Sequence, residues 1–144
     1  MVRMRTTTLA AAVAPILLAL PLLAACSEDE PADPTAPVEV ELGKEFTWND
    51  FTVADGWSLE TMNPSAGVES VEMPVIAAEA TNGADEPRFV LFEVVFAKEG
   101  NRLATIHCTS VSIEPGATEP LDCTGFGQEV PQGQDTIVVQ EITR

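Results

Sequence analysis

The sequence is poor in the residues on which most enzyme chemistry depends. Its 144 residues include one histidine, His107, three cysteines and no tyrosine. A Ser-His-Asp triad would need that histidine as its base, and no Gly-x-Ser-x-Gly turn is present to carry a nucleophile. A catalytic zinc ion needs three protein ligands, and the chain has neither a Cys-x-x-Cys pair nor a Gly-rich phosphate loop. We therefore predict that the protein is not an enzyme, that it holds no cofactor or metal, and that His107 is a strand residue that is either half exposed or hydrogen-bonded.

Basic residues are also scarce. Seven lysines and arginines stand against 23 acidic residues. Such a surface repels nucleic acid phosphates, so nucleic acid binding is excluded as a function. It also repels anionic lipid headgroups, so contact with a membrane would have to come from an anchor. High net charge keeps an exported protein soluble, and we expect a monomer.

The chain lacks an apolar run long enough to span a bilayer. Arg3 and Arg5 precede 17 uncharged residues, 9–25, which Pro15 and Pro21 interrupt. A membrane-spanning helix needs about 20 apolar residues. A short positive segment followed by a short apolar one is typical of a cleaved secretory signal peptide, which we place at residues 1–25.

The end of this segment resembles the lipobox of bacterial lipoproteins. Leu23-Ala24-Ala25-Cys26 has the family pattern of a branched aliphatic residue, two small residues and a cysteine. The resemblance implies that the Cys26 sulfur receives a diacylglyceryl group and that cleavage makes Cys26 the first mature residue. Two or three acyl chains, palmitate among them, would then anchor the protein stably at the extracytoplasmic face of the cell membrane. The alternative is an ordinary cleavage site followed by a cysteine.

Residues 27–37, SEDEPADPTAP, have the composition of a tether. They contain three prolines, four acidic residues and no large apolar side chain, so they cannot bury a core. We predict a lipidated Cys26 and a disordered tether over 26–37, which at about 3 Å per residue reaches roughly 35 Å. A calcium site at 28–30 is not expected, because the ligand spacing of a calcium loop is absent.

From Val38 to Arg144 the pattern is that of an all-β domain. Short apolar runs alternate with turns rich in Gly, Pro, Asn and Asp, which predicts an antiparallel β-sandwich or barrel. The run Arg88–Lys98 is apolar on both faces apart from Glu93, so it should be a central strand. The last strand should pair with an interior one. Expected strands are 38–48, 51–53, 57–60, 68–81, 88–98, 103–113, 119–126 and 135–142.

The domain also resembles the FxLyD-type domains of small lipoproteins from high-GC Gram-positive bacteria. The resemblance covers about residues 68–124. It rests on a long strand ending at Thr81-Asn82, a strand closed by Lys98-Glu99-Gly100-Asn101, and a further strand leading to Pro115-Gly116. It implies an immunoglobulin-like β-sandwich and no catalytic residues.

If Cys26 is lipidated, Cys108 and Cys123 are the remaining thiols, and outside the cytoplasm we expect them to form a disulfide. The turn Glu114–Ala117 has Pro and Gly at its centre, which suits a type II turn. If it joined two paired strands, Cys108 and Cys123 would stand directly opposite each other. In that register Pro120 would interrupt the ladder. The loop is therefore wider, or the strands belong to opposite sheets and the bond joins the sheets.

Two function classes fit these features. The first is a protein-interaction module at the cell envelope with an unidentified envelope protein as partner. It predicts a contiguous apolar or aromatic patch on one face. The alternative is a small-ligand or ion-binding lipoprotein accessory to a transporter, which predicts a concave polar and apolar pocket. Trp48 and Trp57 could stack on sugars, but we expect them to pack within the sandwich.

Overall fold

The computed structural model describes residues 32–63 and 72–143 of the chain. The predicted signal peptide, Cys26 and the acidic residues 28–30 lie outside these ranges. None of the described segments forms a helix that could span a bilayer.

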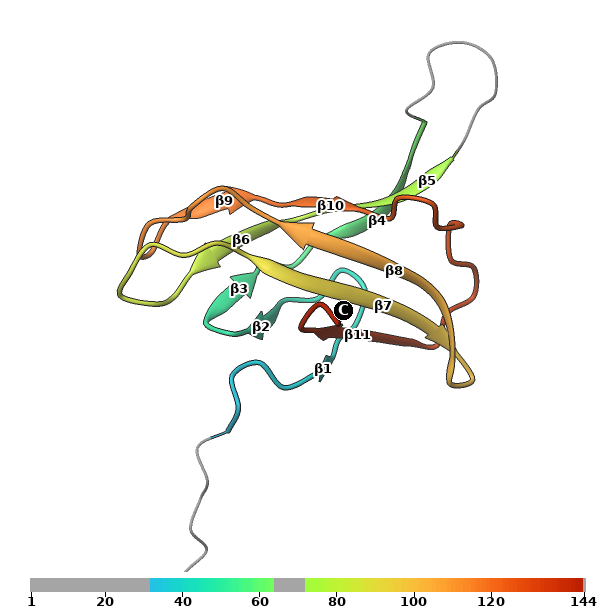
Figure 1. The fold of residues 1–144 in the computed structure, drawn as a ribbon, viewed down its shortest axis with the longest axis horizontal. Coiled ribbons are helices and arrows are strands. Elements are labelled where there is room, and N and C mark those ends of the chain that lie inside the picture. The colour runs from blue at the N-terminus through green and yellow to red at the C-terminus, as the bar shows by residue number, and fades with distance from the viewer. Residues whose placement is uncertain (1–31, 64–71, 144) are drawn as a thin grey trace, which may run out of the picture. The chain divides into compact units, whose positions relative to one another are not determined.

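The described residues form two antiparallel β-sheets (Figure 1). The larger, sheet A, has the strand order β1 (Val38–Glu39), β11 (Thr136–Gln140), β7 (Leu91–Lys98), β8 (Asn101–Thr109), β10 (Asp122–Thr124), β5 (Met73–Ala77) and β4 (Ser58–Met62). The smaller, sheet B, has the order β2 (Phe46–Trp48), β3 (Phe51–Val53), β6 (Glu79–Asn82) and β9 (Thr118–Pro120). The predicted all-β sandwich is confirmed. As expected, β7 is an interior strand, and the C-terminal β11 pairs with it.

Three segments predicted as single strands each divide into two strands that lie in different sheets. The segment 68–81 yields β5 and β6, which meet at Ala78. The segment 119–126 yields β9 and β10, which meet at Leu121. Figure 1 shows that β5 leads directly into β6 and that β9 leads directly into β10. The Leu121 amide donates to the Ala78 carbonyl (2.9 Å), so the two crossings lie side by side.

The third divided segment is 38–48. β1 pairs with β11 in sheet A, whereas β2 pairs with β3 in sheet B. A turn separates them, in which the Lys44 amide donates to the Glu41 carbonyl (3.1 Å). Gly43 takes a φ of 79° there, a left-handed conformation that glycine adopts without steric cost.

Two hairpins have two-residue loops. Glu99 and Gly100 join β7 to β8 with φ values of 49° and 78°, and Asn49 and Asp50 join β2 to β3 with 48° and 64°. Positive φ at both loop positions defines a type I′ turn, whose twist matches that of the strands it joins. The turn predicted at 98–101 is thus confirmed. The amide of Glu99 donates to the Asp135 carboxylate (2.8 Å).

The core lies between the sheets and is centred on aromatic side chains. Phe92 of β7 lies edge-on to Trp48 and Phe46, with ring centroids 5.6 and 6.3 Å away, and Phe46 lies edge-on to Trp57 at 5.8 Å. Both indole nitrogens donate to carbonyls, Trp48 Nε1 to Ala36 and Trp57 Nε1 to Lys44. The tryptophans are buried packing residues, as expected.

The C-terminal end of the predicted tether contacts the domain. Asp33 Oδ1 accepts hydrogen bonds from the Thr35 amide (2.9 Å) and hydroxyl (2.8 Å), which forms a turn. The Pro34 carbonyl accepts the amide of Asn49, and the Ala36 carbonyl accepts the Trp48 indole. Residues 34 and 36 of the predicted tether therefore lie against the β2–β3 hairpin, which supplies the donors for these carbonyls.

Candidate functional site

Cys108 and Cys123 form a disulfide between neighbouring strands of sheet A. They stand directly opposite each other on β8 and β10, with 4.0 Å between their Cα atoms. Both are buried on the inner face. The predicted bond and the predicted opposed register are confirmed, and the alternative of a bond joining the two sheets is wrong.

Between the two cysteines the chain leaves sheet A and returns. Ile113 pairs with Arg88, and the predicted turn follows, with the Ala117 amide donating to the Glu114 carbonyl (3.0 Å). The chain then forms β9 at the edge of sheet B, where Pro120 interrupts no interior ladder. The predicted alternative of a wider loop is therefore the correct one. The disulfide closes this loop across a sequence separation of 15.

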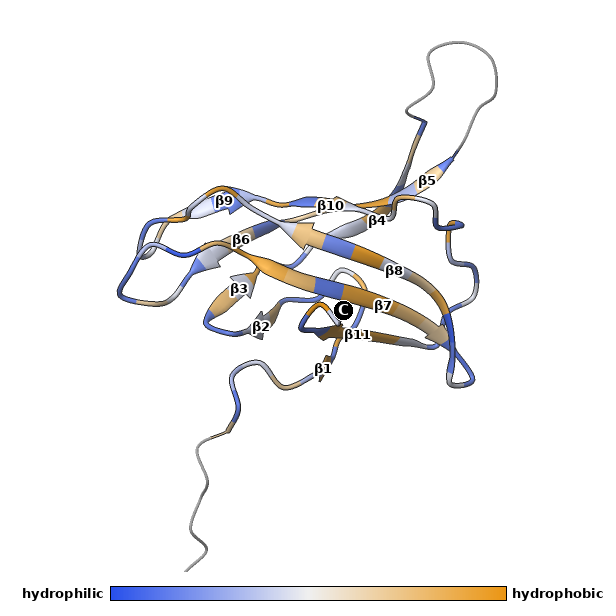
Figure 2. Ribbon diagram, in the orientation of Figure 1, coloured by the Kyte–Doolittle hydropathy of each residue, from blue (hydrophilic) through white to orange (hydrophobic). Residues whose placement is uncertain are grey.

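Glu93, in the middle of β7, is a buried carboxylate on the outer face of sheet A, with a side-chain exposure of 2%. Its Oε1 accepts hydrogen bonds from Gln140 Nε2 (2.7 Å) on β11 and from the Thr143 hydroxyl (3.3 Å) beyond it. Buried charges persist when hydrogen bonds satisfy them. Glu93 thus holds the C-terminal segment against the central strand. Figure 2 shows β7 as a hydrophobic strand interrupted by a hydrophilic band.

His107 stands opposite Glu93 on β8, with its side chain 55% exposed. Its Nε2 lies 3.5 Å from Glu93 Oε2, so protonated His107 would form an ion pair with Glu93. The hydroxyl of Ser110, on the same segment, accepts a hydrogen bond from the Val90 amide and donates one to the Val111 carbonyl. Both of these hydrogen bonds are to backbone groups. The predicted half-exposed strand histidine is confirmed.

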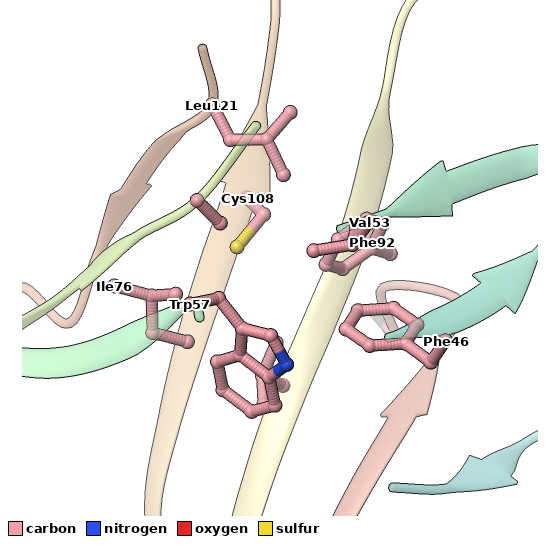
Figure 3. Close-up of a pocket in the computed structure, with 9 residues that line it drawn as sticks. Phe46, Val53, Trp57, Ile76, Phe92, Cys108 and Leu121 are labelled. Atoms are coloured by element: carbon pink, nitrogen blue, oxygen red, sulfur yellow. The ribbon is translucent and has the colours of Figure 1, made fainter. Parts of the chain in front are cut away.

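The void that the core residues line between the two sheets is too small for a ligand. Phe46, Trp57, Phe92 and Cys108 line an apolar void whose volume is about 10 Å³, and Figure 3 shows how these side chains lie. A water molecule needs about 10–15 Å³ and polar partners, so this void stays dry. An open groove of about 410 Å³ lies beside the sheet crossings, lined by Asp55, Glu79 and short or apolar side chains.

Three exposed apolar side chains form what we call the apolar patch, namely Phe89 (66% exposed), Leu91 (57%) and Val111 (65%). Phe89 and Leu91 alternate with buried Val90 and Phe92, so both point away from the core. Val111 lies on the neighbouring segment, because Arg88 pairs with Ile113 and Leu91 pairs with Thr109. The apolar patch is therefore exposed to solvent at the end of the β7–β8 pair where Leu91 faces Thr109.

Among the described residues, no group of three or more His, Cys, Asp or Glu side chains is placed to hold a metal ion.

Phe126 is a further exposed apolar residue outside the patch. It is 85% exposed and lies in the turn after β10.

The sequence reasoning missed two features. Glu93 was noted as an interruption of an apolar face, but its partner Gln140 lies 47 positions away. Phe89 and Leu91 belong to the run that was predicted to be apolar on both faces, and no signal indicated that they would remain uncovered. No protein-family model, curated protein or solved structure matches the chain.

Proposed function

We propose that the protein is a lipid-anchored lipoprotein at the extracytoplasmic face of the bacterial cell membrane. Its immunoglobulin-like β-sandwich would serve as a non-enzymatic module that binds another envelope protein. The Leu23–Cys26 lipobox and the acidic segment after it support the anchor. The proline-rich, acidic composition of residues 27–37 supports a tether between the anchor and the domain.

The apolar patch is the observation that carries the binding role. Phe89, Leu91 and Val111 are each more than half exposed and lie on two neighbouring segments. Exposed apolar clusters with polar surroundings are typical of protein-binding surfaces. Aromatic and aliphatic anchors of this kind contribute most of the binding energy in such interfaces.

The alternative function is a small-ligand or ion-binding lipoprotein accessory to a transporter. The groove beside Asp55 and Glu79 favours it, since its volume of about 410 Å³ lies in the range of small-molecule sites. The groove is open, however, and Ala54, Gly56, Ala77 and Ala78 supply much of its lining. Short side chains offer few groups to orient a ligand, so we favour the protein-binding role.

Chemical crosslinking on intact cells, followed by mass spectrometry of the crosslinked peptides, tests the proposed function. We expect crosslinks between the domain and at least one other envelope protein. Crosslinks confined to peptides of this chain, at crosslinker concentrations that join known neighbours in the same envelope, would contradict a protein-binding role. Binding of a small solute in the groove without any protein crosslink would support the alternative.

A further inference from the structure

Three exposed carboxylates lie near the apolar patch in the strand register. Glu86 and Glu114 flank the Arg88–Ile113 pair at one end of it, and both are exposed. Asp122 pairs with Thr109, which in turn pairs with Leu91, so all three side chains are on the outer face of sheet A. Strands lie about 4.8 Å apart, which places Asp122 about 10 Å from Leu91. We call Glu86, Glu114 and Asp122 the acidic rim of the patch.

The side chain of Arg88, the basic residue next to the patch, contacts the β2–β3 hairpin and not the rim carboxylates. In residues 83–93 and 109–122 Arg88 is the only lysine or arginine. Its guanidinium bonds to Asn49 Oδ1 (3.0 Å) and Asp50 Oδ2 (3.3 Å), and its Cζ lies 5.2 Å from the centre of the Phe51 ring. Arg88 is thus committed to the β2–β3 hairpin, and the rim carboxylates keep their negative charge for a partner.

The acidic rim decides between three occupants of the patch. A second copy of this chain, related by a two-fold axis, would bring the same carboxylates face to face, and like charges across an interface repel. A membrane surface with anionic headgroups would repel the rim in the same way. A protein surface whose apolar contact is surrounded by lysines or arginines complements both the patch and its rim.

We propose that the apolar patch binds a protein that presents an apolar contact surrounded by basic side chains. This inference rests on the proposed function and assigns its binding surface. Phe89, Leu91 and Val111 would be buried at the centre of the interface, and Glu86, Glu114 and Asp122 would pair with the partner's cations at its edge. Pairs at the edge of an interface mainly guide association and depend on salt.

The experiment uses the full-length protein in its own cell envelope with a photoreactive benzophenone side chain at Leu91, and separately at Phe89. The matched control carries it at Thr47, which is exposed on the outer face of sheet B, because its neighbours Phe46 and Trp48 pack inward. We expect a protein adduct from positions 89 and 91 and none from position 47. Mass spectrometry should place the adduct in a segment of the partner that is rich in lysine or arginine.

Charge dependence is tested by combining the probe at Leu91 with Glu86→Gln, Glu114→Gln and Asp122→Asn. We expect about tenfold less adduct, which corresponds to a rim contribution of about 1.4 kcal/mol. The control removes the same charge with Glu39→Gln, Glu41→Gln and Glu45→Gln, which are exposed positions outside the rim. It should leave the adduct yield unchanged.

The outcomes separate this inference from the proposed function. A protein adduct from Thr47 but not from positions 89 and 91 would leave a binding role standing and overturn the patch. An adduct of two copies of this chain, or an adduct with lipid alone, would also overturn it. An equal loss of adduct in both charge variants would overturn the role of the rim. No protein adduct at any of the three positions would contradict both proposals.

Discussion

Cys123 stands directly opposite Cys108, and the bond between them closes a loop that leaves sheet A, forms β9 in sheet B and returns. The disulfide therefore fixes both ends of the segment that contains β9. Without it, the pairing of β9 with β6 and of β10 with β8 would depend on short ladders of three residue pairs each.

Replacing both cysteines, as Cys108→Ala/Cys123→Ala, should lower the stability of the domain markedly. A cross-link across about 15 residues contributes roughly 3 kcal/mol by restricting the unfolded chain. For a domain of this size the melting temperature should fall by about 10 °C. Thermal unfolding followed by circular dichroism measures the change. Reductant should lower the melting temperature of the native protein towards that of the variant and leave the variant unaffected; equal values without reductant would contradict the prediction.

The opposition of Cys108 and Cys123 was predicted on the assumption that the Glu114–Ala117 turn joins two paired strands. The two cysteines are opposed as predicted, but Ile113 pairs with Arg88 and β9 pairs with β6, so this turn does not set their register. The path between them could not be predicted in detail. It depends on β6 offering an edge to β9, and these strands are distant in sequence.

The sheet crossings at Ala78 and Leu121 were missed for a related reason. Ile76 and Ala80 are both buried, so the alternation of inward and outward residues runs through the crossing unchanged. A strand that moves from one sheet to the other keeps facing the same core, and period-2 patterning carries no mark of the change. The turn residues, in contrast, marked Glu99–Gly100 correctly because positive φ favours glycine.

Glu93→Gln should destabilise the domain by about 1–2 kcal/mol. The substitution replaces the carboxylate that accepts the Gln140 amide at 2.7 Å with a neutral group, and hydrogen bonds to charged groups contribute about 1.5–3 kcal/mol. Urea unfolding measures the difference. Glu141→Gln, an exposed position on the same C-terminal segment, is the matched control and should change stability by less than about 0.5 kcal/mol. Equal effects of both substitutions would show that Glu93 does not hold the segment.

The turn formed by Asp33 and Thr35, which leads into the docked carbonyls of residues 34 and 36, should weaken in acid. Hydrogen bonds from the Thr35 amide and hydroxyl hold the pKa of Asp33 below its usual value of 3.8. A carboxyl with a depressed pKa in the folded state stabilises that state above its ordinary pKa and loses this effect as the pH falls through the lowered value. The Trp48 indole N–H, which donates to the Ala36 carbonyl, reports on docking by NMR.

We expect the Trp48 indole resonance to shift as the pH falls below about 3.8, while that of Trp57, bonded to the Lys44 carbonyl, stays in place. Asp33→Asn keeps a side-chain acceptor that does not titrate, so in this variant the Trp48 shift should disappear. A shift that persists in Asp33→Asn, or that both indoles share, would mean that another group controls the transition.

Cys26→Ala should release the protein from the membrane or leave the precursor uncleaved, because the lipid is attached to the sulfur that the substitution removes. The native protein should fractionate with membranes, and its N-terminal peptide should begin at Cys26 and carry the mass of acyl chains. Anchoring by two or more chains is stable, so high salt should not extract it. Cys108→Ala/Cys123→Ala is the control, since it removes the other two cysteines and should stay anchored. A mature chain that begins at another residue, with an unmodified thiol at Cys26, would refute the anchor and leave the β-sandwich without a tie to the membrane.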